Sequence, residues 1–291
     1  MRIIVNLIRF LVLTFVYFCT FAVVSGLLLS MPAEQAAPAE PGTALLALLA
    51  VSVINTAVFT YIIRRSHWTG WKLVVSIFFV FYGVTTLMPQ IETAFFVTHL
   101  PPGMLPRLFL AGAIIAAVFS PLAVLILGKV RSRLDNAAGP SLLRMPVAVW
   151  VAKLGFIVIA YEVIYFTFGY FIAWKNPAVR AYYGGSDPRS FIDHLVSLLR
   201  DQPSLFLLQA ARALLWTAIA VPVIKMMKGQ WWESGLAVAL LFAAVNSQLL
   251  LPNPLMPYEV RMAHLLETAT SNFLFGWLIV IVLRKIRPKS V

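Results

Sequence analysis

The side chains best suited to chemistry lie together near the C-terminus, where residues 259–272 read Glu-Val-Arg-Met-Ala-His-Leu-Leu-Glu-Thr-Ala-Thr-Ser-Asn. In a helix, at about 100° per residue, the polar members of this stretch would share an arc of about 140°; they are Arg261, His264, Glu267, Thr268, Ser271 and Asn272. A histidine and a carboxylate three residues apart can exchange protons or bind a hard divalent metal, and an arginine can hold an anionic group. This stretch is therefore the first candidate site.

Three further ionisable residues interrupt apolar stretches elsewhere in the chain: Glu92, Glu162 and Arg212. An ionisable side chain in hydrocarbon is costly unless it is neutralised, paired or hydrated, so each of these residues is a functional candidate. Arginine stays charged at physiological pH, so Arg212 needs a carboxylate or a bound anion as its partner. Pro89, just before Glu92, lacks an N–H group and predicts an irregular helix beside that acid.

We expect these residues to converge in the folded protein as ligand-binding or proton-coupling groups. The set is Glu92, Glu162, Arg212, Arg261, His264, Glu267 and Asn272. The candidate ligands for a metal are His264, Glu267 and Glu92, although the spacing identifies no particular metal and no cofactor. In the alternative interpretation, the polar face of 259–272 only packs against neighbouring helices through interhelical hydrogen bonds.

The elements that position these residues are transmembrane helices. Of the 291 residues, 61% are hydrophobic and 12% are charged, whereas roughly 25% of residues are charged in soluble domains. The one cysteine, Cys19, lies in an apolar stretch and excludes a disulfide framework or a cysteine zinc site. A helix needs about 20 apolar residues to cross a bilayer. The sequence predicts eight such helices in a single all-α integral membrane domain over 1–291, near 6–30, 43–64, 71–98, 105–128, 147–174, 204–226, 232–252 and 259–284.

The distribution of charge predicts the orientation, because short cytoplasmic loops are enriched in Lys and Arg. With the N-terminus inside, the inner segments hold 16 of the 23 basic residues and two of the 11 acidic residues. We therefore expect both termini in the cytoplasm and the protein in the plasma (inner) membrane. The basic residues are spread over loops and a C-terminal tail, which indicates contact with the lipid bilayer and argues against nucleic acid as a partner.

The longest loop predicted on the outer side, 175–203, is expected to contain a short amphipathic helix. Asp187 and Pro188 have the residue types of an N-cap and a first helical residue. The apolar residues that follow share one helical face. Such a helix would lie flat in the membrane interface. Residues 31–42 are expected to form the first outer loop.

Most polar residues of the predicted spans lie in their outer halves, which predicts a polar cavity open to the outer face. The leading hypothesis is transport or binding of a small or lipid-linked ligand in that cavity. Two alternatives stay open: a structural or assembly subunit with membrane-protein partners, and an intramembrane enzyme that acts on a lipid substrate with a His/Glu site. The sequence contains no zincin, nucleophile-elbow, P-loop or dinucleotide-binding motif that would decide among them.

The charge asymmetry generates a direct test of the orientation. In a variant with Cys19→Ala, a cysteine placed within 177–187 should react with an impermeant thiol reagent added outside intact cells. A cysteine placed within 133–142 should not react until the cells are lysed. The opposite labelling pattern would overturn the predicted orientation.

Overall fold

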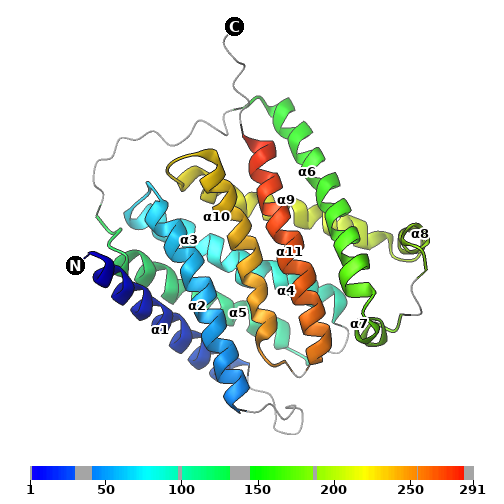
Figure 1. Ribbon diagram of the computed structural model, residues 1–291, viewed down its shortest axis with the longest axis horizontal. Helices are drawn as coiled ribbons and strands as arrows, with labels where there is room; N and C mark the ends of the chain where they lie inside the picture. Colours follow the sequence, from blue (N-terminus) through cyan, green and yellow to red (C-terminus); the bar gives the residue numbers. More distant parts are fainter. Residues whose placement is uncertain are drawn as a thin grey trace.

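The computed structural model describes residues 2–29, 41–97, 100–131, 145–185, 189–253 and 255–284 (Figure 1). Within these ranges the protein is all-helical, and eight helices are long and apolar enough to span a membrane. The predicted class of multi-pass helical membrane protein is confirmed. Most of the first outer loop predicted at 31–42 falls outside the described residues. The spans cover 3–28, 43–65, 70–96, 104–126, 147–174, 203–226, 231–250 and 258–283, close to the predicted ranges.

Some spans are single regular helices and others include an irregular segment. The regular ones are α1 (Arg2–Leu28), α2 (Pro41–Arg65), α5 (Met104–Ile126), α9 (Pro203–Met226) and α11 (Tyr258–Leu283). The third span comprises α3 (Gly70–Tyr82), the π-helical segment η2 (Gly83–Leu87) and α4 (Met88–Phe96). The remaining two are α6 (Val147–Phe168) with the π-helical segment η4 (Gly169–Trp174), and α10 (Trp231–Ala244) with the 3₁₀ segment η5 (Val245–Leu250). Two short helices, α7 (Pro177–Tyr182) and α8 (Phe191–Asp201), lie between spans.

The irregular segment of the third span is the one that Pro89 predicts. Proline has no N–H to donate to the carbonyl four residues earlier, which here belongs to Thr85. That carbonyl instead accepts a hydrogen bond from Gln248 Nε2 of η5, at 3.3 Å. Lipid has no donor for this carbonyl, so Gln248 supplies one from within the protein. The same hydrogen bond links the two irregular segments η2 and η5.

Figure 1 shows α2, α10, α11 and α6 side by side in the nearer layer, with α5, α3, α4 and α9 crossing behind them. α1 packs against α2 and α5 at one edge. An aromatic core lies where α1, α2, α3 and α5 meet. It contains Tyr17, Phe59, Phe81 and Phe119, each 1% exposed or less, with neighbouring ring centroids 4.9–5.8 Å apart. Aromatic pairs at these separations stabilise a core beyond their apolar burial.

Basic residues gather at one end of the bundle, at the ends of spans that the charge pattern assigns to the cytoplasm. Arg65 at the end of α2 forms an ion pair with Glu233 at the start of α10. The Arg284 guanidinium, just after α11, lies 4.5 Å from the ring centroid of Trp231 in α10. Lys153 of α6 donates a hydrogen bond to the Arg284 carbonyl at 3.0 Å.

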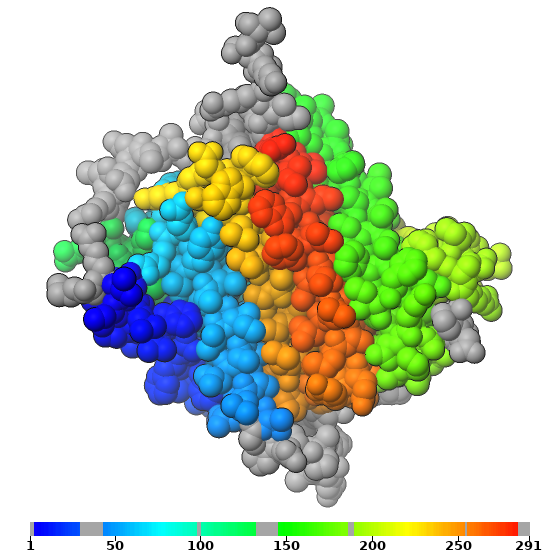
Figure 2. Space-filling model, viewed as in Figure 1, coloured from blue at the N-terminus to red at the C-terminus, as the bar shows by residue number. Residues whose placement is uncertain are grey.

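The loop predicted at 175–203 contains α8, which has apolar side chains exposed along one face. Ser190 is its N-cap, and the Ser190 hydroxyl oxygen accepts a hydrogen bond from the Asp193 N–H at 3.2 Å. Asp187 and Pro188, the predicted start, lie outside the described residues. Figure 2 shows α8, in yellow-green, projecting from the side of the bundle.

Gly276 marks a close approach of α11 to α10. A Cβ atom at this position would lie 2.7–2.9 Å from backbone atoms of Ala239 and Val238. We expect Gly276→Ala to lower the free energy of unfolding by about 1–3 kcal/mol, the usual cost of overpacking, measured as a lower melting temperature in detergent. Gly155→Ala is the matched control, because a Cβ there would meet nothing within 4 Å. Equal stability of the two variants would contradict the close packing.

Candidate functional site

An ion pair between α4 and α9 lies at the centre of the candidate site. Arg212 Nη1 lies 2.6 Å from Glu92 Oε1 and 2.8 Å from Gln209 Oε1. Gln209 precedes Arg212 by one helical turn, so the two side chains project from the same face of α9. The Arg212 side chain is 4% exposed and the Glu92 side chain is 34% exposed. The positive charge is therefore enclosed by the bundle, whereas the negative charge is partly exposed at the surface of the bundle.

The ion pair leaves hydrogen-bond donors unused. Within the described part of the chain, neither Arg212 Nε nor Gln209 Nε2 has a hydrogen-bond partner. An unsatisfied buried donor costs about 1–3 kcal/mol, and more in a charged group. Folded proteins therefore seldom leave such donors unpaired. These two N–H groups are thus buried donors without an acceptor among the described residues.

Tyr183, His264 and Glu267 form a second polar group, held together by a chain of hydrogen bonds. His264 Nδ1 lies 2.8 Å from Glu267 Oε2, and His264 Nε2 lies 3.2 Å from the Tyr183 hydroxyl oxygen. An ionised carboxylate accepts a hydrogen bond from the Nδ1–H group. In a neutral ring, Nε2 can then accept a hydrogen bond from the tyrosine hydroxyl. The His264 side chain is 20% exposed and the Glu267 side chain 8% exposed. The chain of hydrogen bonds thus leads from the surface of the bundle toward its interior.

Helix α6 contributes to both polar groups. At its end, η4 brings Gly169 beside Glu267, where an added Cβ atom would lie 3.4 Å from Oε1. The absence of a side chain at Gly169 thus leaves room for that carboxylate. The hydroxyls of Tyr161 and Tyr165 interact electrostatically with three charged residues of the site: Glu92, Arg212 and Glu267.

Tyr183, which follows α7, also lies within the electrostatic influence of these residues. Burial raises the pKa of its hydroxyl, and the nearby Tyr182, Glu92 and Glu267 raise it further. The hydroxyl therefore keeps its proton at physiological pH and can donate it in a hydrogen bond to His264.

The structure brings together four residues of the predicted set, namely Glu92, Arg212, His264 and Glu267. Glu162 does not join them. It is half-buried on α6 and has no hydrogen bond or ion pair with any described residue. Each step along a helix turns the side chain by about 100°, so Tyr161 and Tyr165 can face the site while Glu162 points elsewhere.

Arg261 and Asn272 lie at opposite ends of the polar face of α11. Arg261 Nη1 donates to three successive carbonyls at 2.6–3.2 Å, those of Leu249, Leu250 and Leu251. These carbonyls end the irregular segment η5, where the helix dipole favours a cation. Arg261 therefore stabilises the end of a span, a structural use of a residue that the sequence suggests for anion binding. Asn272 is 7% exposed and makes no hydrogen bond with the described residues.

Each of the three candidate metal ligands, Glu92, His264 and Glu267, has a side-chain partner in the structure. The described residues contain no group of three His, Cys, Asp or Glu side chains close enough to hold a metal ion. Glu92 is paired with Arg212, while His264 and Glu267 are bonded to each other. His99, another polar residue near the end of the third span, lies outside the described residues. The arrangement instead offers groups for anion binding and proton exchange.

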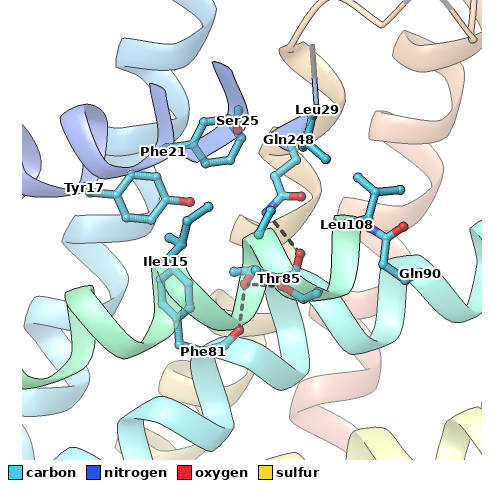
Figure 3. Close-up of a pocket in the computed structure, with 13 residues that line it drawn as sticks. Tyr17, Phe21, Ser25, Leu29, Phe81, Thr85, Gln90, Leu108, Ile115 and Gln248 are labelled. Atoms are coloured by element: carbon cyan, nitrogen blue, oxygen red, sulfur yellow. Dashed lines mark hydrogen bonds between the residues drawn. The ribbon is translucent and has the colours of Figure 1, made fainter. Parts of the chain in front are cut away.

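A cavity of about 80 Å³ lies beside η2 and α4, among residues that the sequence interpretation did not select (Figure 3). The polar residues that line it are Tyr17, Ser25, Thr85, Thr86, Gln90 and Gln248. None of the predicted site residues lines it. Uncharged polar residues are common in membrane spans, and these come from separate helices, so their spacing along the chain carries no signal. The one available signal was the irregularity that Pro89 predicts in this part of the third span.

Comparison with known proteins finds no matching family model, no matching curated protein and no matching solved structure. The site provides an enclosed cation with free donors, an accessible carboxylate, and a Tyr–His–Glu chain that can pass protons.

The unequal burial of the ion pair predicts unequal costs of removing its partners. Glu92→Leu leaves an enclosed guanidinium unpaired and should destabilise the protein by about 3–5 kcal/mol. Arg212→Leu leaves a carboxylate that is 34% exposed and can take up a proton, so its cost should be smaller. The double variant should be more stable than Glu92→Leu alone. Melting temperatures in detergent measure all members of this cycle.

Arg65 and Glu233 provide a control cycle. Arg65 is 44% exposed, and an exposed ion pair contributes about 1 kcal/mol or less. Leucine substitution of either partner should therefore have a small effect. Equal destabilisation by Glu92→Leu and Arg212→Leu would contradict the enclosed position of the cation.

Proposed function

We propose that the protein binds and transports a small or lipid-linked anionic ligand, with Arg212 as the anion-binding residue. The observation that carries this proposal is the unequal burial of the ion pair, in which Arg212 is 4% exposed and Glu92 is 34% exposed. A cation fixed inside the bundle is thus paired with a carboxylate that a ligand can reach. An anionic group that replaced Glu92 would keep the charge balanced inside the membrane.

The free donors favour a ligand that carries several oxygen atoms. A guanidinium binds carboxylate or phosphate through two parallel hydrogen bonds. Arg212 Nε and Gln209 Nε2, which have no partner among the described residues, support such a contact. A phosphate or carboxylate on Arg212 would satisfy donors that Glu92 and the Gln209 carbonyl leave unused.

The Tyr183–His264–Glu267 chain supports coupling of ligand binding to a proton. A carboxylate released from its cation in an apolar setting is stabilised by taking up a proton. Histidine is the side chain whose ordinary pKa lies nearest neutral pH, so His264 can exchange that proton. A change in the charge of Glu92 would act on the titratable and charged groups around it, which are Arg212, Tyr161, Tyr165, Tyr183, His264 and Glu267. A proton gradient would then drive transport.

The proposed site opens to the outer face of the plasma (inner) membrane. Glu92, Arg212 and His264 lie in the halves of their spans that are farther from the basic end of the bundle. The positive-inside rule assigns that basic end, with both termini, to the cytoplasm. Helix α8 would lie in the outer interface, near the entrance to the site.

The hydrogen-bond chain favours a second candidate, an intramembrane enzyme that acts on a lipid substrate. A carboxylate that orients a histidine beside a hydroxyl is a recurring acid–base arrangement. Here Glu267 would orient His264, which would accept a proton from water. Arg212 would bind an anionic group of the substrate in either case.

Binding of anions to the purified full chain tests the proposal. The probes are inorganic phosphate, acetate and a short-chain polyprenyl phosphate, each measured by its effect on the melting temperature. Arg212→Gln should abolish binding, and Arg212→Lys should weaken it because lysine lacks the guanidinium fork. Glu92→Gln should strengthen it roughly tenfold, equivalent to about 1.4 kcal/mol, because the competing carboxylate is removed.

Arg65→Gln is the matched control and should leave anion binding unchanged. If Glu92→Gln and Arg212→Gln both bind the probes as the unmodified protein does, Arg212 is not the anion site. Chemical analysis of the probe after incubation with proteoliposomes separates the two candidates. A transporter moves the polyprenyl phosphate across the bilayer unchanged, whereas an enzyme converts it into a product.

A further inference from the structure

The cavity beside η2 and α4 is a site separate from the charged residues (Figure 3). It has a volume of about 80 Å³ and is lined by residues of α1, α3, η2, α4, α5 and η5. Tyr17 and Phe81 line its buried part, whereas Leu29, just after α1, and Leu108, near the start of α5, are half-buried. The cavity therefore extends from the aromatic core toward the surface of the bundle.

Three polar atoms at the cavity have no hydrogen-bond partner in the described part of the protein. They are Tyr17 Oη, Ser25 Oγ and Gln90 Oε1. Tyr17 is 1% exposed and packs against the rings of Phe81 and Phe119, so bulk solvent does not reach it. Buried polar groups of this kind are normally hydrogen-bonded. Figure 3 shows Tyr17 and Gln90 at opposite sides of the cavity, so polar groups face it from two directions.

The neutral lining selects the kind of ligand. None of the 13 described residues that line the cavity is charged. Gln248 Nε2 already donates to the Thr85 carbonyl at 3.3 Å, and the Thr85 hydroxyl donates to the Phe81 carbonyl at 2.8 Å. The unpaired atoms are two hydroxyls and an amide oxygen, which can exchange hydrogen bonds with a neutral hydroxyl. A charged group would lose its hydration here without gaining a counter-ion.

The remaining walls suit a hydrocarbon stem, because they are formed by Phe21, Leu29, Leu108 and Ile115. We propose that this cavity binds the hydroxyl-bearing end of an uncharged amphiphile, held by Tyr17, Ser25 and Gln90. A lipid alcohol from the bilayer and a small soluble polyol share this chemistry, and the experiment separates them. The inference is independent of the proposed anion site, since no residue of that site lines the cavity.

Saturation-transfer NMR on the purified full chain in detergent tests the proposal, with 1-pentanol, pentane, pentanoate and glycerol as probes. Ala111 lines the cavity and is 2% exposed, so Ala111→Leu should fill it. The difference in signal between the unmodified protein and this variant separates binding in the cavity from partition into detergent. Ile115→Phe is a second filling variant, to be used if the first does not fold.

Pentanol should give a difference signal, whereas pentane and pentanoate should give little or none. Binding of pentanol without glycerol would indicate a lipid alcohol as the natural ligand, and binding of glycerol as well would indicate a soluble polyol. Tyr17→Phe should weaken pentanol binding about threefold to tenfold, the usual effect of one lost hydrogen bond.

Tyr258→Phe is the matched control, because Tyr258 is 64% exposed and lies outside the cavity. The cavity is also large enough to hold water, because one water molecule needs a cavity volume of roughly 10–15 Å³. Absence of a pentanol difference signal would indicate a site for ordered water only and overturn the proposal. Binding of pentane or pentanoate as strong as that of pentanol would also overturn the proposal. Unchanged pentanol affinity in Tyr17→Phe would do the same.

Discussion

The arrangement of the bundle depends on keeping the guanidinium of Arg212 paired in the interior of a membrane protein. Arginine cannot lose its proton there and lipid cannot hydrate it, so neighbouring helices have to supply oxygen acceptors. Glu92 and Gln209 supply them at 2.6 Å and 2.8 Å. This requirement draws α4 onto α9, and polar residues of α6 and α11 complete the same site. The charged cluster is therefore both a structural constraint and the candidate functional site.

The irregular parts of the spans lie where backbone or side-chain polar groups need room or partners. In η2 the Thr85 carbonyl, left free by proline, accepts from Gln248, and at the end of η5 three carbonyls accept from Arg261. In η4 a glycine makes room for Glu267. A membrane interior tolerates irregular backbone only when such groups are satisfied. π-helical segments within helices occur frequently at functional sites, which agrees with a functional role for this part of the bundle.

The sequence could predict the spans because apolar length and charge are properties of a local stretch. It also predicted the irregular third span, since proline acts on a carbonyl only one turn away. It could not predict which face of each helix meets a neighbour. Glu162 and Tyr161 are adjacent in the chain, yet only the tyrosine contributes to the charged site. The carbonyls that Arg261 binds and the cavity around Tyr17 arise from contacts between distant segments, and spacing along the chain does not record them.

We propose that the Glu92 carboxylate is accessible from the outer side and covers the enclosed Arg212 cation. The most direct measurement is the accessibility of a cysteine at each position, in a variant with Cys19→Ala, to the anionic reagent 2-sulfonatoethyl methanethiosulfonate. Our account predicts that Glu92→Cys reacts rapidly when the reagent is added outside intact cells, and that Arg212→Cys reacts far more slowly. Equal rates at the two positions, or reaction of Glu92→Cys only from the cytoplasmic side, would contradict it.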